Sequence, residues 1–166
     1  NGISDLPAIS ADGRYVAFVS SATNLVEGDT NGKVDIFVHD HFSGITELVS
    51  RTWYGGLAND SSDVPSISAD GRYVAYYSYA SNLVLGDTNN FTDVFRYDRQ
   101  THRTERASLS EWAEQGDNHS LCSTISQDGW VVAFYSFAEN LVAGDSNGYN
   151  DVFLRDFSRA LPGYTV

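Results

Sequence analysis

The sequence has 166 residues, of which 42% are hydrophobic and 13% aromatic, so it is long and apolar enough to form one domain with a core. Ten Lys and Arg residues against 22 Asp and Glu residues give a formal net charge of −12, which disfavours nucleic acid as a partner. No apolar stretch approaches membrane-spanning length, so we expect no membrane insertion.

The sequence contains one cysteine and no methionine. The single cysteine, Cys122, excludes an internal disulfide, and we expect it to be a small buried side chain. The sequence has no methionine, even at its first position, which favours a processed or excised piece of a longer protein.

The chain repeats itself with a period of 58 residues, which is typical of repeat architectures. The units begin at Ser4, Ser62 and Ser120, and divide one repeat domain, 1–166, into 4–61, 62–119 and 120–166. The third unit is cut short, with Tyr164 at the place of Leu48 in the first unit.

Each unit is predicted to form four antiparallel strands, which in the first unit are 6–10, 14–20, 35–39 and 45–51. Asp12 and Gly13 supply the tight turn between the first two strands, because Gly adopts positive φ without strain. Both faces of the second strand are apolar, which is typical of a sheet buried on both sides. We find no helical period between breakers.

This pattern predicts an all-β fold, a β-propeller of three four-stranded antiparallel blades, with a single-chain β-trefoil or β-prism as alternatives. The motif SADGRYVAF at 10–18, followed by DIFVHD at 35–40, resembles the TolB-like, WD-repeat-like β-propeller blade. The second unit carries the motif at 68–76, and the third carries a weaker copy at 126–134. The resemblance implies an extracytoplasmic protein, periplasmic, secreted or on the cell surface, of a bacterium.

Three blades do not close a ring, because propellers have about four or more. Open blades leave unpaired edges and apolar faces exposed. We therefore expect self-association of two chains into a six-bladed ring, and a fragment of a longer propeller is the alternative.

An Asp-rich loop follows the second strand of every unit: GDTNGKVDIF from Gly28, GDTNNFTDVF from Gly86 and GDSNGYNDVF from Gly144. Calcium prefers six to eight oxygens from carboxylates, amides and backbone carbonyls, and alternate residues of a curled loop supply them. We expect about one structural Ca²⁺ per blade, rather than Asp and Asn that merely cap turns. The expected ligands are Asp29, Asn31, Lys33 and Asp35; Asp87, Asn89, Phe91 and Asp93; and Asp145, Asn147, Tyr149 and Asp151. Position five, which is Lys, Phe or Tyr, would act through its backbone carbonyl, and Asn24, Asn82 or Asn140 is a possible additional ligand.

The loops that join one blade to the next carry Trp53, Tyr54 and Trp112. These rings either bind a sugar or protein ligand or pack over the blade tops, and burial is the commoner fate of aromatic side chains.

No G-x-S-x-G or H-E-x-x-H motif is present, so we expect no enzyme activity. The sequence predicts a non-catalytic, calcium-binding propeller module for protein binding or assembly, and the alternatives are a lectin and the propeller part of a larger secreted hydrolase.

Overall fold

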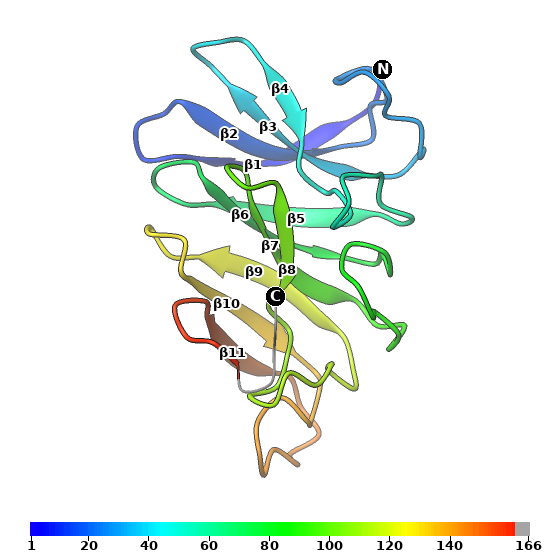
Figure 1. The fold of residues 1–166 in the computed structure, drawn as a ribbon, viewed down its shortest axis with the longest axis vertical. Helices are drawn as coiled ribbons and strands as arrows, with labels where there is room; N and C mark the ends of the chain where they lie inside the picture. Colours follow the sequence, from blue (N-terminus) through cyan, green and yellow to red (C-terminus); the bar gives the residue numbers. More distant parts are fainter. Residues whose placement is uncertain (162–166) are drawn as a thin grey trace.

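The computed structural model describes residues 1–161, which form eleven strands in three antiparallel sheets, one sheet in each repeat unit (Figure 1). The first sheet contains β1 (Ser4–Ile9), β2 (Tyr15–Ser20), β3 (Asp35–Asp40) and β4 (Thr46–Leu48). The second contains β5 (Ser62–Ile67), β6 (Tyr73–Ser78), β7 (Asp93–Asp98) and β8 (Arg103–Arg106). The third contains β9 (Ser120–Ile125), β10 (Val131–Ser136) and β11 (Asp151–Asp156).

Strands that follow one another in the chain lie next to one another in each sheet, so every sheet is a simple up-and-down meander. The three sheets are stacked along the longest axis of the molecule, with the first at the top of Figure 1. The expected fourth strand of the third unit, which includes Tyr164, lies outside the described residues. The fourth strand of the first unit is shorter than predicted, because only Thr46–Leu48 pairs with β3 and Arg51 instead bridges to Leu57.

The predicted Asp-Gly turn joins β1 to β2. Gly13 has φ +74, and the Ser10 hydroxyl and the Arg14 backbone N–H both donate to Asp12 Oδ1, at 2.6 and 3.0 Å. The second and third units repeat this turn, which holds the two strands of each hairpin in register.

The first strand of each unit starts earlier than predicted and contains a β-bulge. Leu6, Val64 and Cys122 have φ near +50 at the bulge, a conformation that is uncommon for such side chains. The prediction that Cys122 is buried is wrong. The bulge takes this position out of the regular alternation, and the Cys122 side chain is exposed.

The core lies between the sheets. Ala17, Val19 and Val38 of the first sheet pack against Tyr76 and Phe95 of the second, and the opposite face of the second sheet packs against the third. Every residue of β6 and β7 is buried, so the expectation of a sheet covered on both sides is confirmed for the second sheet. The equivalent strands β2 and β10, at the two ends of the stack, are only partly buried.

Two repeated contacts join adjacent sheets. The ring of Tyr15 lies over Gly71, and the ring of Tyr73 lies over Gly129, so close that a Cβ at either glycine would stand 2.1 Å from the ring. The Ala69 backbone accepts a hydrogen bond from Ala11 N–H at 3.0 Å, and its own N–H donates to Gln127 at 2.8 Å. The second sheet therefore presents one face to the first unit and the opposite face to the third.

Candidate functional sites

The Asp-rich loops connect the second and third strands, and each is closed by its own asparagine. Asn31 Oδ1 accepts the Lys33 N–H at 2.9 Å, and the same turn occurs at Asn89 and Asn147. These loops lie beside the connection to the next unit, because Asn31 Nδ2 donates to Ala58 O and Asn89 Nδ2 donates to Gly116 O. In the first two units, the Asp-rich loop and the connection to the next unit therefore lie side by side.

In the first loop, Asp29 and Asp35 are both buried. Asp35 accepts hydrogen bonds from the Ser50 hydroxyl at 2.6 Å and from Asn31 Nδ2 at 2.8 Å. Asp29 Oδ1 has no hydrogen-bond partner among residues 1–161. Burial raises the pKa of both carboxyl groups, and the negative charge of Asp29 raises that of Asp35 further.

In the second loop, the side chain of Arg106 from β8 lies against both carboxylates. Its Nη2 lies 3.0 Å from Asp87 Oδ1, and its Nη1 lies 3.4 Å from Asp93 Oδ2. Burial raises the pKa of Asp87 and of Asp93, and Arg106 acts in the opposite direction on both. A guanidinium therefore lies where the sequence predicted calcium bound by Asp87, Asn89, Phe91 and Asp93.

The third loop is more open. Asn147 Nδ2 donates to Asp151 Oδ2 at 2.7 Å, and the loop borders a shallow surface hollow with Asp145. The residue equivalent to Arg106 is Tyr164, which lies outside the described residues. The amides of Asn82 and Asn140, named above as possible additional calcium ligands, bind the backbone of the preceding connection.

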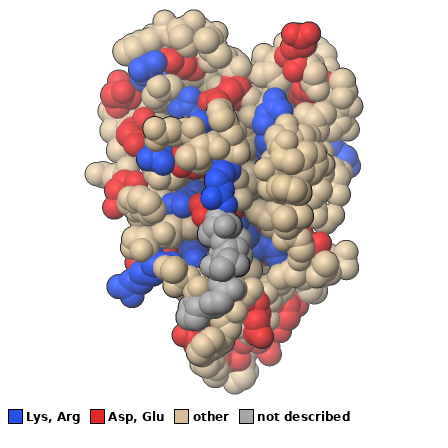
Figure 2. Space-filling view, in the orientation of Figure 1, with Lys and Arg blue, Asp and Glu red and all other residues tan. Residues whose placement is uncertain are grey.

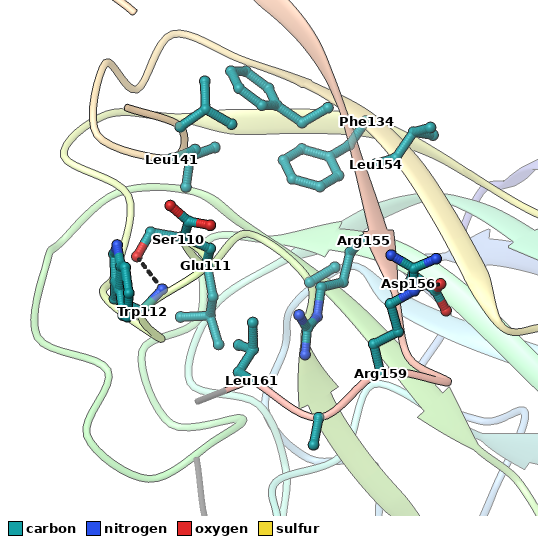
Figure 3. A pocket seen from close by; sticks show the side chains of 15 residues that line it. Ser110, Glu111, Trp112, Phe134, Leu141, Leu154, Arg155, Asp156, Arg159 and Leu161 are labelled. Atoms are coloured by element: carbon teal, nitrogen blue, oxygen red, sulfur yellow. Dashed lines mark hydrogen bonds and ion pairs between the residues drawn. The ribbon is translucent and has the colours of Figure 1, made fainter. Parts of the chain in front are cut away.

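The three aromatic side chains in the connections are exposed rather than packed over the blade tops. Trp53 is 50%, Tyr54 64% and Trp112 66% exposed, and the first two rings meet edge to face at 5.3 Å. Trp112 borders a pocket of about 370 Å³ whose apolar wall includes Phe134 and Leu141 (Figure 3). The pocket does not contain all three rings, so the structure does not bring them together into one site.

The outer face of the third sheet is apolar and exposed, as expected for an open blade, although the sequence analysis named none of its residues. Val152 and Leu154 of β11 are 78% and 71% exposed, whereas Ile36 and Val38 at the same places in the first unit are 0% exposed. The opposite end of the stack also lacks a neighbour, since a Cβ at Gly13 would meet no described side chain within 4 Å. The repeat in the sequence predicts this exposure. The third unit carries the same apolar positions as the first, but no described unit follows it to cover them.

Lys and Arg side chains are interspersed with Asp and Glu on the face shown in Figure 2. Within residues 1–161, no helix has the length and apolar character needed to span a membrane.

No protein-family model and no curated protein matches the chain. Among solved structures it is similar to a putative TolB from Agrobacterium tumefaciens, at 19% identity and a TM-score of 0.54, over 94% of this chain and 46% of that chain. It is also similar to the β-propeller domain of the Trilobed protease from Pyrococcus furiosus, at 12% identity and a TM-score of 0.50, over 93% of this chain and 43% of that chain. A structure from a study of two prolyl endopeptidases matches at 17% identity and a TM-score of 0.54, over 98% of this chain and 21% of that chain.

The chain thus spans less than half of each of these structures. The likeness shows a TolB-like β-propeller fold, and the chain forms a partial propeller in which each sheet is a blade.

Proposed function

We propose that the chain is a non-catalytic β-propeller module for protein binding or assembly, and that a second copy is its first partner. The observation that carries the proposal is the exposure of Val152 and Leu154 on a blade face that is fully buried at the equivalent positions of the first blade. An apolar blade face left in water is unfavourable, and burial against another blade relieves this cost.

The contacts between neighbouring blades supply the geometry for such a partner. If the hydrogen bond that joins Ala69 to Gln127 were repeated once more, it would join Gln127 N–H to the carbonyl of Ala11 in the second copy. Val131 stands in the third blade where Tyr15 and Tyr73 stand in the first two, and it would lie over the partner's open Gly13. Two such joints close a ring of six blades around a two-fold axis.

Self-association is tested by measuring the mass of the purified chain over a range of concentrations by light scattering. We expect a dimer of about twice 18.2 kDa for the unchanged chain and a monomer for Val152→Asp, because a buried carboxylate at the joint is costly. Gln100→Glu is the control, because it adds one negative charge at an exposed turn of the second blade, which lies between the two blades that form the joints. A monomeric unchanged chain, or a Val152→Asp variant that still dimerises, would refute the proposed ring.

The propeller part of a larger hydrolase is a second candidate, because several similar structures are peptidases of which this chain covers a small share. In that case, further blades of the same protein would cover the exposed faces.

The exposed rings of Trp53, Tyr54 and Trp112 favour a lectin as a third candidate, because aromatic faces stack on sugar rings. The resemblance to TolB-like blades supports an extracytoplasmic location for the module in all three cases.

A further inference from the structure

The first loop holds two acidic side chains whose charge is not balanced by an ion pair within the described residues. Asp35 is 0% and Asp29 is 6% exposed, and Asp29 Oδ1 is buried without a hydrogen-bond partner in that part of the chain. Buried charges in proteins are normally paired or bound to metal, because removal from water without compensation is costly. An unpartnered, buried carboxylate oxygen beside a second carboxylate is therefore a candidate cation ligand.

The second loop shows which kind of group binds at this place. Arg106 inserts its guanidinium between Asp87 and Asp93, and its Nη1 also donates to Gln115 Oε1 at 2.8 Å. With a repeat period of 58, the residue in the first blade at the place of Arg106 is Leu48, which is buried and carries no charge. The equivalent carboxylates thus lie against a cationic side chain in the second blade, and the first blade has no cationic side chain at that position.

Two other cationic side chains lie near the first loop, and each has different partners. The guanidinium of Arg51 donates to the carbonyl oxygens of Leu48 and Gly55, at 3.1 and 2.8 Å. Its positive charge acts on Asp29 and Asp35 by longer-range electrostatic attraction. Lys33 Nζ lies 3.0 Å from Asp60 Oδ1, outside the loop. Neither takes the place that Arg106 has in the second blade.

We propose that the first loop binds one calcium ion between Asp29 and Asp35, at the place that the guanidinium of Arg106 occupies in the second loop. Both carboxylates offer oxygen ligands, and each oxygen accepts more than one interaction, so the bonds from Ser50 and Asn31 to Asp35 leave room for a cation. Calcium suits the site better than magnesium, because it tolerates irregular geometry and takes carboxylate and carbonyl oxygens readily. This inference goes beyond assembly, since a chain that stays monomeric keeps the complete loop.

The test exchanges the equivalent residues of the two blades. Leu48→Arg gives the first loop the cation of the second, and Arg106→Leu opens the second loop. Asp29→Asn removes one ligand, and Glu27→Gln is the matched control, since it removes one negative charge at an exposed position beside the loop. Calcium is titrated into chelator-treated protein by calorimetry, and native mass spectrometry counts the ions bound to each variant.

We expect Leu48→Arg to bind one ion fewer than the unchanged chain, Arg106→Leu to bind one more, and Glu27→Gln to bind the same number. Asp29→Asn should weaken the first site by about tenfold or more, because calcium affinity depends on the number of charged ligands. Any calcium bound elsewhere in the chain is common to all variants and cancels in the comparison.

Equal calcium binding by the unchanged chain, Asp29→Asn and Leu48→Arg, with circular dichroism showing that each is folded, would overturn the proposal. If Arg106→Leu does not fold without calcium, the milder Arg106→Gln takes its place. A folded variant at this position that gains no ion would overturn the equivalence of the two loops.

Discussion

The contact of Tyr15 with Gly71 makes a direct test of how adjacent blades are held together. An added Cβ at Gly71 would lie 2.1 Å from the Tyr15 ring, so Gly71→Ala must displace that ring. Gly13 occupies the same turn in the first blade with nearly the same φ, +74 against +73, and a Cβ there meets no described side chain within 4 Å. The two substitutions therefore impose the same backbone strain, and only one of them disturbs the packing between blades.

The size of each effect follows from this difference. An alanine in the left-handed region costs about 1–2 kcal/mol, and this cost applies at both positions. Overpacking at Gly71 adds about 1–3 kcal/mol. We expect Gly13→Ala to lower the free energy of unfolding by about 1–2 kcal/mol and Gly71→Ala by about 2–5 kcal/mol, measured by urea denaturation on dilute, monomeric protein. Gly129→Ala, under the ring of Tyr73, should behave as Gly71→Ala does.

Equal losses for Gly13→Ala and Gly71→Ala would refute the reasoning, because they would mean that the Tyr15 contact adds nothing to the backbone term. The same pair of variants also bears on assembly. If a second copy covers the first blade, Gly13 lies at a joint, and Gly13→Ala should weaken dimerisation while remaining the milder change in the monomer. Gly71→Ala lies within one chain and should act at every concentration.

Three further outcomes follow from the charges and the aromatic rings. In calcium-free solution, Arg106→Leu should lower the free energy of unfolding by about 3–5 kcal/mol in urea denaturation, since it leaves two buried carboxylates without their cation. Burial raises the pKa of Asp29 and Asp35 above the unfolded value of 3.8, so the folded state binds protons more tightly than the unfolded chain. The contribution of these two groups to stability should therefore fall as pH rises from about 4 through their raised pKa values, and Asp29→Asn should reduce this slope in thermal melts without calcium. Trp112→Ala should change stability by less than about 0.5 kcal/mol, because the ring is exposed, but should weaken any oligosaccharide binding followed by tryptophan fluorescence.

The repeat made much of the fold predictable from the sequence. The apolar second strands, the Asp-Gly turns and the period of 58 residues each act locally, and three copies of one pattern support a single interpretation. The bulge at Cys122 was not predictable in this way. It depends on the backbone conformation of β9, the first strand of the unit, and the equivalent residues Leu6 and Val64 are of types that are usually buried.

The candidate sites were less predictable, because they depend on neighbours that are distant in sequence. The loop sequences identify Asp87 and Asp93 but not Arg106, which comes from β8, the fourth strand of the unit. The equivalent residue of the first unit, Leu48, carries no charge and so gives no hint of this ion pair. The exposure of Val152 depends on whether another blade stands next to the third one, which the number of repeat units indicates but no residue near Val152 does.

The two carboxylates of each loop also have different structural partners, and this separates their roles. Asp35 Oδ1 accepts the Ser50 hydroxyl at 2.6 Å, as Asp93 Oδ1 accepts that of Ser108 at 2.5 Å, and each serine accepts a backbone N–H from the third strand. Through its serine, the second carboxylate of each loop thus holds the segment that follows the fourth strand of the unit against the third strand, whether or not a cation is bound. Asp29 has no such bond at Oδ1. Asp35→Ala, which removes the acceptor of the Ser50 hydroxyl, should therefore destabilise the chain with and without calcium. The loss caused by Asp29→Asn should appear chiefly when calcium is present.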